Sequence, residues 1–372
     1  MSSLFAAAAL LALSATAMVG ADTIRVAIAE NSRAAELRGV NIEVSELGCP
    51  ACPRAGWRTD TVRAAASGQG VAIDGRIAPA FRLTSDAPIR MAGREYPATL
   101  EIVRYGDGLA IVNELHLEEY LVGVLRAETS ERWPHETLRA QAIVARTYAA
   151  FHRASSGPRP YHLVASTSHQ MYLGHVPATS PIWDAVRDTA GQVLLWDGEL
   201  FPAFYHSTSG GYTEDPRSVF AALNMPALKA IRDEFSAGAP HFYWTLDLKL
   251  ADLSDILKRN GYDVGAVTAI EVTERTASLR VASLTVHGRR SAAKLRGNDF
   301  RRMVGYETVK STLFAVALDG GVARFSGRGY GHGVGMSQWG AKGMAEQGYK
   351  AEKILEYYYP GTTLGFLGAR SR

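Results

Sequence analysis

The 372-residue sequence predicts an α+β protein, with a β-rich N-terminal accessory region followed by a mixed α/β domain that carries an inserted α/β subdomain. Three observations predict this class. Residues 22–100 alternate short β-like runs with turns. Residues 101–372 combine apolar positions at helical spacing with strand-like runs, and residues 245–320 within them repeat that mixture. A content of 47% hydrophobic and 21% charged residues suits a globular protein with a sizeable core.

The N-terminus has the pattern of a secretory signal peptide. Residues 4–19 are almost wholly small or apolar, and Gly20 and Ala21 follow before Asp22. The run is short for a membrane span, so we predict a signal peptide at residues 1–21. No Lys or Arg precedes the run, which leaves an uncleaved anchor or a buried helix as the alternative. We expect an exported protein of the periplasm, the cell envelope or the extracellular space.

The accessory region contains the β-like runs TIRVAIAE, GVAIDGRI, FRLTSD and IRMAGREY, and both cysteines of the chain. Cys49 and Cys52 lie among Gly48, Pro50 and Pro53. Outside the cytoplasm such a pair can form a disulfide that closes a small loop. A thioredoxin-type motif would begin a helix after a strand, and a zinc half-site needs two more ligands, none of which is near in sequence. We therefore interpret the pair as a loop disulfide.

The second region begins with a hairpin and two helices. EIVRYGDGLAIVNEL predicts a hairpin that turns at residues 106–108, and LEEYLVGVLRAE predicts a helix after it. HETLRAQAIVARTYAAFHRA predicts the next helix, because Pro134 suits a first helical turn. Arg139, Arg146 and Arg153 recur every seven residues along this helix. Arg146 lies in the alanine-rich part and is the one we expect to pair with a carboxylate.

The remaining elements follow in order. SSGPRP predicts a loop at residues 155–160, and strands and loops are expected from there to about residue 232. In the inserted subdomain LADLSDILKRNG predicts a helix, and AIEVTE, LRVASLTVHG and AVALDG predict strands. SQWGAKGMAEQG and AEKILEYYYPG predict two closing helices, the second ended by Pro360 and Gly361.

The run GRGYGHGVGMSQWG, residues 327–340, has glycine at every second position from Gly327 to Gly335. In an extended strand these glycines would share one bare face. Glycine within a strand marks a bend, a packed crossing, or the close approach of a ligand. A phosphate-binding loop is disfavoured, because the spacing is not G-x-G-x-x-G and no lysine follows.

Glu128 is the candidate catalytic residue. It ends an apolar helix and precedes a turn that contains Trp133 and Pro134. A carboxyl beside an indole can have a raised pKa and donate a proton, although a solvated helix-terminal carboxylate is the plain alternative. Glu131 and Glu136 occupy turn positions at which a solvated carboxylate is ordinary.

Other polar clusters carry weaker signals. FYHSTSGGYTED contains His206, Ser207 and Ser209, but lacks the G-x-S-x-G pattern of a nucleophilic serine, so we interpret it as a polar loop lining a cleft. His162, His169 and His206 could form a metal site, although scattered histidines are more often ordinary polar residues. A net charge of +3 without a dense basic block argues against nucleic acid as a partner.

Five blocks of the sequence resemble the SpoIID/LytB family of stage II sporulation protein D and the amidase enhancer LytB. They are LEEYLVGVLRAETSERWPHETLRAQAIVARTYA, STSHQMY, FYHSTSGGYTED, LRGNDFRRMVGYETVKSTLF and GYGHGVGMSQWGAKGMAEQGYKAEKILEYYYPGT. The blocks follow the order and spacing of the family and cover roughly residues 100–370. The resemblance implies that residues 101–372 form a SpoIID-type catalytic domain.

The resemblance implies a peptidoglycan lytic transglycosylase. Glu128 would protonate the glycosidic oxygen and then accept the proton of the muramic acid 6-hydroxyl, which closes on C1 to give a 1,6-anhydro sugar. Because the substrate supplies the nucleophile, one carboxyl suffices, unlike the two of a hydrolase. For glycan binding we expect a set of polar and aromatic side chains with one glycine: Arg146, His206, Ser207, Ser209, Tyr330, His332, Gly333, Gln338 and Trp339.

The resemblance also implies partners. The substrate would be peptidoglycan glycan strands, stripped of stem peptides by an N-acetylmuramoyl-L-alanine amidase. Some relatives bind zinc through cysteine and histidine near STSHQMY, but this segment has no cysteine here, so we expect neither metal nor cofactor. The alternatives are a non-catalytic glycan-binding protein or activator of an amidase, and, more remotely, a thiol-redox protein that uses Cys49 and Cys52.

Overall fold

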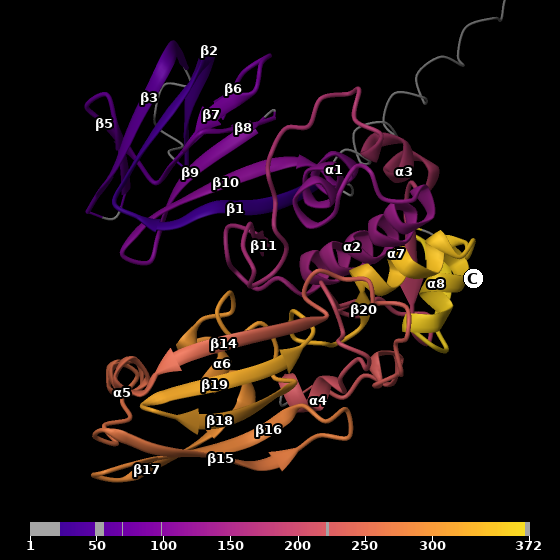
Figure 1. The fold of residues 1–372 in the computed structure, drawn as a ribbon. Coiled ribbons are helices and arrows are strands. Elements are labelled where there is room, and N and C mark those ends of the chain that lie inside the picture. The colour runs from indigo at the N-terminus through magenta and orange to yellow at the C-terminus, as the bar shows by residue number, and fades with distance from the viewer. Residues whose placement is uncertain (1–22, 49–55, 69, 98, 221–222, 369–372) are drawn as a thin grey trace, which may run out of the picture. The chain divides into compact units, whose positions relative to one another are not determined.

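The computed structural model describes residues 23–48, 56–68, 70–97, 99–220 and 223–368. The predicted signal peptide and both cysteines lie outside these residues. Strands and helices both contribute, which confirms the α+β class (Figure 1). The chain forms two compact units, and helix α2 contributes to both of them. The first unit is Met1–Arg132, Ala145–Val193 and Gly365–Arg372, and the second is Trp133–Val144 and Leu194–Leu364.

The first unit is built on a sheet whose strands follow the order β11-β1-β10-β9-β6-β2-β3-β4-β5, with β7 and β8 attached beside β2. The predicted hairpin is confirmed: β9 and β10 pair antiparallel across the turn at Gly106 and Asp107. Strand β9 begins at Thr99 and β10 at Gly108, so the sheet continues beyond residue 100, where the accessory region predicted from the sequence ends. The strands are β1 (Thr23–Ser32), β2 (Ala34–Leu47), β3 (Trp57–Ser67), β4 (Gly70–Ile73), β5 (Arg76–Ala78), β6 (Ala80–Thr84), β7 (Ile89–Met91), β8 (Arg94–Tyr96), β9 (Thr99–Tyr105), β10 (Gly108–His116) and β11 (Leu163–Val164).

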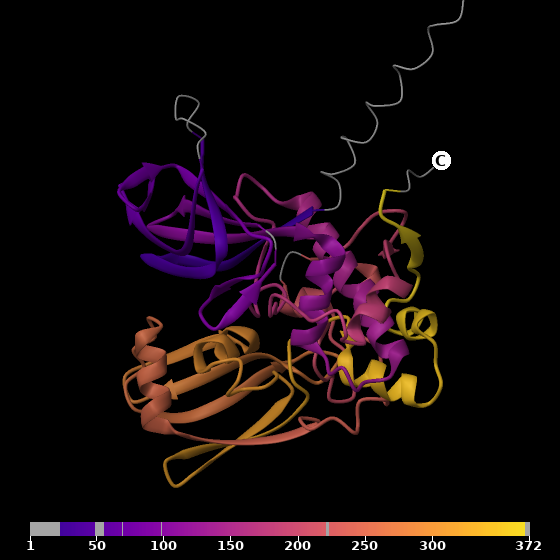
Figure 2. The same ribbon diagram turned by 90° about the horizontal axis from the view of Figure 1, so that it is seen from above.

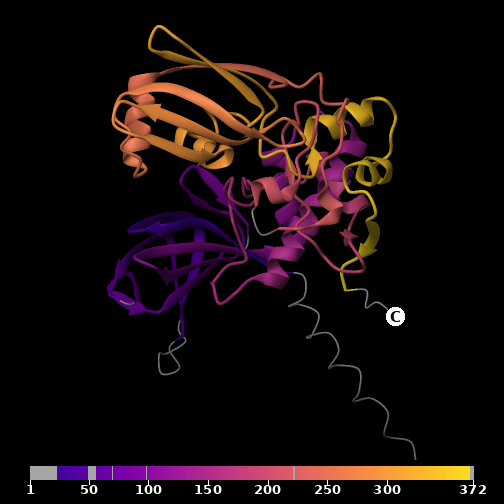
Figure 3. The same cartoon turned by 90° about the horizontal axis from the view of Figure 1, so that it is seen from below.

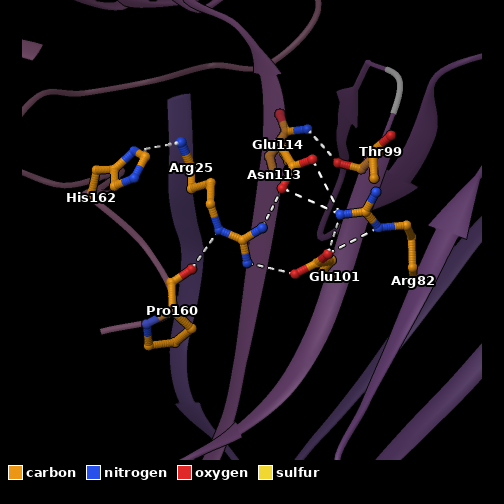
Figure 4. A network of polar contacts seen from close by, with 8 residues as sticks. All are labelled: Arg25, Arg82, Thr99, Glu101, Asn113, Glu114, Pro160 and His162. Atoms are coloured by element: carbon orange, nitrogen blue, oxygen red, sulfur yellow. Dashed lines mark hydrogen bonds and ion pairs between the residues drawn. The ribbon is translucent and has the colours of Figure 1, made fainter. Parts of the chain in front are cut away.

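Four charged residues form a closed network on this sheet (Figure 4). Arg25 pairs with Glu114 and, at 2.5 Å, with Glu101. Arg82 pairs with Glu101 at 2.6 Å and with Glu114 at 3.2 Å. Burial alone would raise the pKa of Glu101, but the hydrogen bonds and charges of the two arginines outweigh it and hold that pKa below its usual value. The network therefore stabilises the fold as long as Glu101 is ionised.

We expect Glu101→Gln to lower the free energy of unfolding by about 2 kcal/mol at pH 7, because it leaves two guanidinium groups short of a charge. Since the folded-state pKa is depressed, this contribution is full above the unfolded-state pKa and disappears as the pH falls through the folded-state pKa. Urea unfolding of both proteins at pH 7 and pH 3 measures it. Glu36→Gln removes two exposed ion pairs, with Arg38 and Arg63, and is the control expected to change little. An equal difference at both pH values would contradict the assignment.

Helices α1 and α3 and the C-terminal part of α2 complete the first unit. Helix α1 (Leu117–Glu128) begins where the side chain of His116 accepts a hydrogen bond from the N–H of Glu118. Helix α2 spans His135–Ser155 and confirms the second predicted helix. The short helix α3 (Ile182–Asp188) falls where strands and loops were expected. Its seven residues are too few to show helical spacing, and it has no side-chain cap that a sequence pattern could reveal.

The second unit contains two small sheets, β14-β19-β18 and β15-β16-β17. Helix α5 (Leu250–Arg259) packs against β14 and β15, and α6 (Gly297–Val304) packs against β16 and β17. Figures 2 and 3 show these orange strands and helices from above and from below. The helix and strands predicted for residues 245–320 are thereby confirmed. The strands are β14 (Tyr243–Lys249), β15 (Val267–Arg275), β16 (Val281–Gly288), β17 (Ala292–Arg296), β18 (Phe314–Asp319) and β19 (Val322–Arg328).

The closing helices α7 (Gln338–Glu346) and α8 (Ala351–Tyr358) are also confirmed, and they share a core with Val334 and Met336. Within the described ranges no helix is both long enough and apolar enough to cross a bilayer. The short elements that remain are β12 (Gln192–Leu195), β13 (Tyr205–His206), α4 (Pro216–Val219), η1 (Pro226–Leu228), β20 (Met336–Ser337) and β21 (Thr363–Phe366).

Candidate functional site

Glu128 is the last residue of α1, in the first unit. The helix ends there because Thr129 has an extended backbone, with φ −132° and ψ −178°. Its N–H and hydroxyl both donate to the carbonyl of Leu125, at 2.9 and 2.7 Å. Oε1 of Glu128 accepts a hydrogen bond from the N–H of Met171 at 2.9 Å. The carboxyl is half-buried and is anchored through one oxygen to the main chain.

The STSHQMY segment supplies that anchor and is itself fixed. Gln170 is fully buried, accepts from the hydroxyl of Tyr120 at 3.1 Å, and donates to the carbonyl of Ala145 at 3.3 Å. Burial raises the pKa of Tyr120 well above its usual value, and the charges of Tyr148 and Glu128 add to that rise. This positioning role could not be inferred from the sequence, where STSHQMY indicated a possible metal ligand and formed part of the family resemblance.

The other carboxyls considered from the sequence have partners of their own. Glu131 accepts from the hydroxyl of Ser180 at 2.7 Å and pairs with Arg126 at 3.5 Å. Glu136, in the second unit, accepts from the N–H of Ala351 at 2.9 Å and pairs with Arg139. Burial raises the pKa of Glu136, but these contacts outweigh it and lower that pKa. Both carboxyl groups are therefore engaged in structural contacts.

Glu119 is a further carboxyl that sequence reasoning missed. It lies in the first turn of α1 and is half-buried. Burial raises the pKa of Glu119, against the opposing charges of His175 and His116. No motif marks it, because its elevated pKa depends on packing alone.

Arg146 has no exposed side-chain surface. It donates to both carboxylate oxygens of Glu118, at 2.6 and 2.8 Å, and to the carbonyl of Gln192 at 3.1 Å. The predicted carboxylate pairing is confirmed. The direct glycan contact also predicted for Arg146 finds no support, because the guanidinium is enclosed among its partners.

The glycine run in the second unit is a loop, which corrects the expectation of an extended strand. Strand β19 ends at Arg328, and four glycines after it have positive φ angles. Only glycine adopts such angles without strain, and their recurrence at every second residue prevents a continuous strand. They are Gly329 (79°), Gly331 (116°), Gly333 (89°) and Gly335 (71°).

The side-chain-free positions of this loop face protein rather than open space. At every glycine of the run an added Cβ would collide with a neighbouring group. The bare backbone face therefore does not receive a ligand, and the packed-crossing alternative is the correct one. A Cβ added at Gly335 would lie 1.9 Å from the carbonyl oxygen of Phe204, and one added at Gly327 would lie 2.2 Å from the ring of Trp244. At the other three glycines the added Cβ would lie 2.7 Å from its nearest neighbour, which is the carbonyl oxygen of Thr208 for Gly329, the side chain of His206 for Gly331 and the guanidinium of Arg280 for Gly333.

The loop brings two sequence motifs together within the second unit. Strand β13 pairs in parallel with β20, and Thr208 exchanges backbone hydrogen bonds with Tyr330 at 2.8 and 2.9 Å. The N–H of Trp339 donates to the carbonyl of Ser207 at 3.1 Å. FYHSTSGGYTED and GYGHGVGMSQWG thus form one cluster. It holds the predicted residues His206, Ser207, Ser209, Tyr330, His332, Gly333, Gln338 and Trp339.

The two histidines of this cluster are neutral. Burial, the charge of His332 and that of Arg280 lower the pKa of His206 well below its usual value. Burial, Arg301 and Arg280 lower the pKa of His332 to about 3. A neutral His206 donates from Nδ1 to the carbonyl of Val334 at 3.1 Å, which leaves Nε2 as an acceptor. Nε2 is buried and has no hydrogen-bond partner within the described residues.

The remaining residues of the cluster differ in accessibility. Ser209 is fully buried and donates to Asp233 at 2.6 Å, so it has a structural role and direct glycan contact by its side chain is unsupported. Ser207, Tyr330 and Trp339 are half-buried. The centroid of the Trp339 ring lies 5.3 Å from that of Trp133. The Nζ of Lys342 lies over the Trp339 ring, 5.2 Å from its centroid.

Two arginines beneath the loop were missed by sequence reasoning. Arg280 is almost fully buried and donates to the carbonyls of Ser209 and Tyr212, at 2.6 and 2.8 Å. Arg301 donates to the carbonyl of Val309 at 2.8 Å. Burial lowers the pKa of each to about 10, so both remain charged. An isolated arginine in a strand or helix pattern carries no signal that it will be buried.

Among the described residues, no three His, Cys, Asp or Glu side chains are placed to hold one metal ion. Nδ1 of His162 accepts from the N–H of Arg25 at 3.1 Å, while the ring of His169 lies 5.1 Å from that of His152. The expectation that no cofactor is needed stays a prediction.

Comparisons with known proteins support the same sequence blocks. A family model described as stage II sporulation protein matches residues 105–196, and a domain of unknown function matches residues 218–335. The chain is 31% identical over 279 residues to an uncharacterized protein of Brachyspira hyodysenteriae, covering 73% of each. It is 30% identical over 286 residues to stage II sporulation protein D of Bacillus amyloliquefaciens, covering 73% of this chain and 80% of the relative. It is 32% identical over 292 residues to the amidase enhancer of Bacillus subtilis, covering 66% and 40%.

Proposed function

This chain belongs to the family of stage II sporulation protein D, and on that premise we propose that it is an exported lytic transglycosylase of peptidoglycan. The family gives the chain a role in the cell wall. The observation that supports the finer proposal is Glu128, a half-buried carboxyl held by the N–H of Met171. Glu131 and Glu136, by contrast, are committed to structural contacts.

In the proposed reaction Glu128 supplies and recovers one proton. The protonated carboxyl donates to the oxygen that links muramic acid C1 to the next sugar, and that bond breaks. The muramic acid 6-hydroxyl then bonds to C1 and returns its proton to the carboxylate. No water is consumed, so one product ends in a 1,6-anhydro ring. A second catalytic carboxyl is unnecessary because the substrate provides the attacking oxygen.

The accessible members of the loop cluster are the proposed glycan contacts. Trp339 and Tyr330 offer aromatic rings, and Ser207 offers a hydroxyl, all half-buried. Aromatic rings with a polar edge suit the apolar faces and hydroxyl groups of sugars. The proposed substrate is glycan stripped of its stem peptides.

A second candidate function is activation of a cell-wall amidase without catalysis. The relative from Bacillus subtilis named amidase enhancer is the observation that favours it. Both functions require export and glycan binding, but only the enzyme requires the Glu128 carboxyl.

Digestion of purified glycan strands, with and without stem peptides, tests the proposal. Mass spectrometry distinguishes anhydro products from hydrolysis products, which contain one additional water. Anhydro ends support the transglycosylase, whereas ordinary reducing ends require a hydrolase with a second carboxylate. Retained glycan binding without any cleavage favours the amidase-activating role.

A further inference from the structure

The ring of Tyr330, a proposed glycan contact, lies within a small group of polar side chains in the second unit. Its hydroxyl donates to the carboxylate of Glu307. The ammonium of Lys310 lies over the ring, 5.1 Å from its centroid. The ring of His241 meets that of Tyr330 edge to face, with 5.3 Å between the two centroids. These contacts, together with the backbone hydrogen bonds to Thr208, fix the position of the ring.

Lys310 carries an ammonium group that lacks a carboxylate partner. Its Nζ donates to the main-chain carbonyl of Glu307 at 3.3 Å, and it forms no ion pair with any residue that the structure describes. The side chain is half-buried. A half-buried cation has lost part of its hydration, and here no ion pair replaces it. A bound carboxylate would supply that missing interaction.

The charges around Lys310 leave this group of side chains positive. Arg301, which was found above to remain charged, donates to the carbonyl of Val309 at 2.8 Å and likewise has no ion pair within the described ranges. Burial lowers the pKa of His241, and the charge of Lys310 adds to that effect against the opposing charge of Glu307, so the imidazole is neutral at pH 7. Two cations therefore accompany a single carboxyl group, which already accepts the tyrosine hydroxyl.

Stripped glycan carries a charge that peptide-bearing glycan lacks at the same position. The lactyl group of muramic acid ends in a carboxyl group, and the stem peptide is attached there through an amide bond. Hydrolysis of that amide by an amidase leaves a free carboxylate on the sugar. A cation beside a ring that binds the sugar can therefore distinguish the two forms by charge, because charge complementarity contributes to specificity.

We propose that Lys310 determines the preference for stripped glycan, by binding the lactyl carboxylate of a muramic acid whose sugar contacts Tyr330. This inference rests on the proposed function, because it takes stripped glycan as the substrate. The amide of a peptide-bearing strand offers the ammonium no charge and binds more weakly. Lys310 contacts the substrate but takes no part in the proton transfer assigned to Glu128.

Isothermal titration calorimetry with a tetrasaccharide of alternating N-acetylglucosamine and N-acetylmuramic acid tests the proposal. The ligand is prepared with free lactyl carboxylates, with primary amides in their place, or with stem peptides attached. The full chain carries Glu128→Gln throughout, so that the ligand is not cleaved. We expect the carboxylate form to bind about tenfold more tightly than the primary amide, or 1.4 kcal/mol, because the amide removes the charge without adding bulk.

Three substitutions separate the charge of Lys310 from a structural role. Lys310→Gln should bind the carboxylate and amide forms equally, whereas Lys310→Arg should keep the preference because it keeps the charge. The main-chain carbonyl of residue 310, which accepts from the N–H of Gly331 at 2.9 Å, is retained in both, and thermal unfolding checks the fold. Lys294→Gln removes the same charge from an exposed position on β17 and is the matched control, which should keep the preference.

The outcomes separate this inference from the proposed enzyme. A preference for the carboxylate form that depends on the charge at residue 310 supports it, even if the native chain cleaves no glycan. Equal binding of the carboxylate and amide forms before residue 310 is changed overturns it, even if glycan is cleaved. A preference that survives in Lys310→Gln, or the absence of binding by all three ligands, overturns it as well.

Discussion

Replacing Glu128 by glutamine is expected to abolish the release of anhydro-muramic products while leaving the fold intact. The amide has nearly the shape of the carboxyl, and its carbonyl oxygen can still accept from the N–H of Met171 at 2.9 Å. It cannot donate an acidic proton to the leaving oxygen. A positioned general acid contributes on the order of 10²–10⁴ to a rate, so we expect a fall of about a thousandfold. Product release from stripped glycan, followed by mass spectrometry, measures it, and thermal unfolding checks the fold.

Glu131→Gln is the matched control. Glu131 lies three residues along the chain and contacts Ser180 and Arg126, so its variant should cleave normally. Normal cleavage by Glu128→Gln would place the acid elsewhere. Glu119 would then be the next carboxyl to replace, because burial raises its pKa.

The helices that carry the candidate residues were predictable from local pattern. Apolar spacing and Pro134 located α1 and α2, and the alanine-rich surroundings of Arg146 indicated a buried ion pair, which Glu118 provides. These features depend on neighbours along the chain, which a single sequence displays directly.

The loop cluster depended on partners distant in sequence. The spacing of Gly327 to Gly335 correctly predicted that another group packs closely against the backbone. It could not show that the neighbouring groups are Trp244, Thr208 and Phe204 rather than a ligand. For the same reason the buried Arg280 went unnoticed: the carbonyls that hold it are about 70 residues earlier. The glycan contact predicted for Ser209 stays a prediction that its side chain does not support, since its hydroxyl donates to Asp233, a residue 24 positions away in the sequence.

Gly335→Ala should be one of the most destabilising single substitutions in the second unit. Gly335 has a φ of +71°, and an added Cβ would lie 1.9 Å from the carbonyl oxygen of Phe204. That oxygen accepts from the hydroxyl of Tyr359 at 2.7 Å and from the N–H of Met336 at 3.2 Å, so it cannot move without breaking the contact between β13 and β20. We expect the free energy of unfolding to fall by about 3 kcal/mol. The positive φ angle accounts for about 1 kcal/mol of this and overpacking for about 2 kcal/mol.

Gly348→Ala separates the two causes. Gly348 also has a positive φ, +90°, but an added Cβ there meets no atom within 4 Å. The free energy of unfolding of this variant should therefore fall only by the conformational cost of the φ angle, about 1 kcal/mol. Urea unfolding of both variants measures the difference. Equal losses would mean that Gly335 is required for its φ angle alone. A larger loss at Gly335 means that the loop is held by backbone contact, and that the placement of His206 and Ser207 depends on a glycine that carries no chemistry of its own.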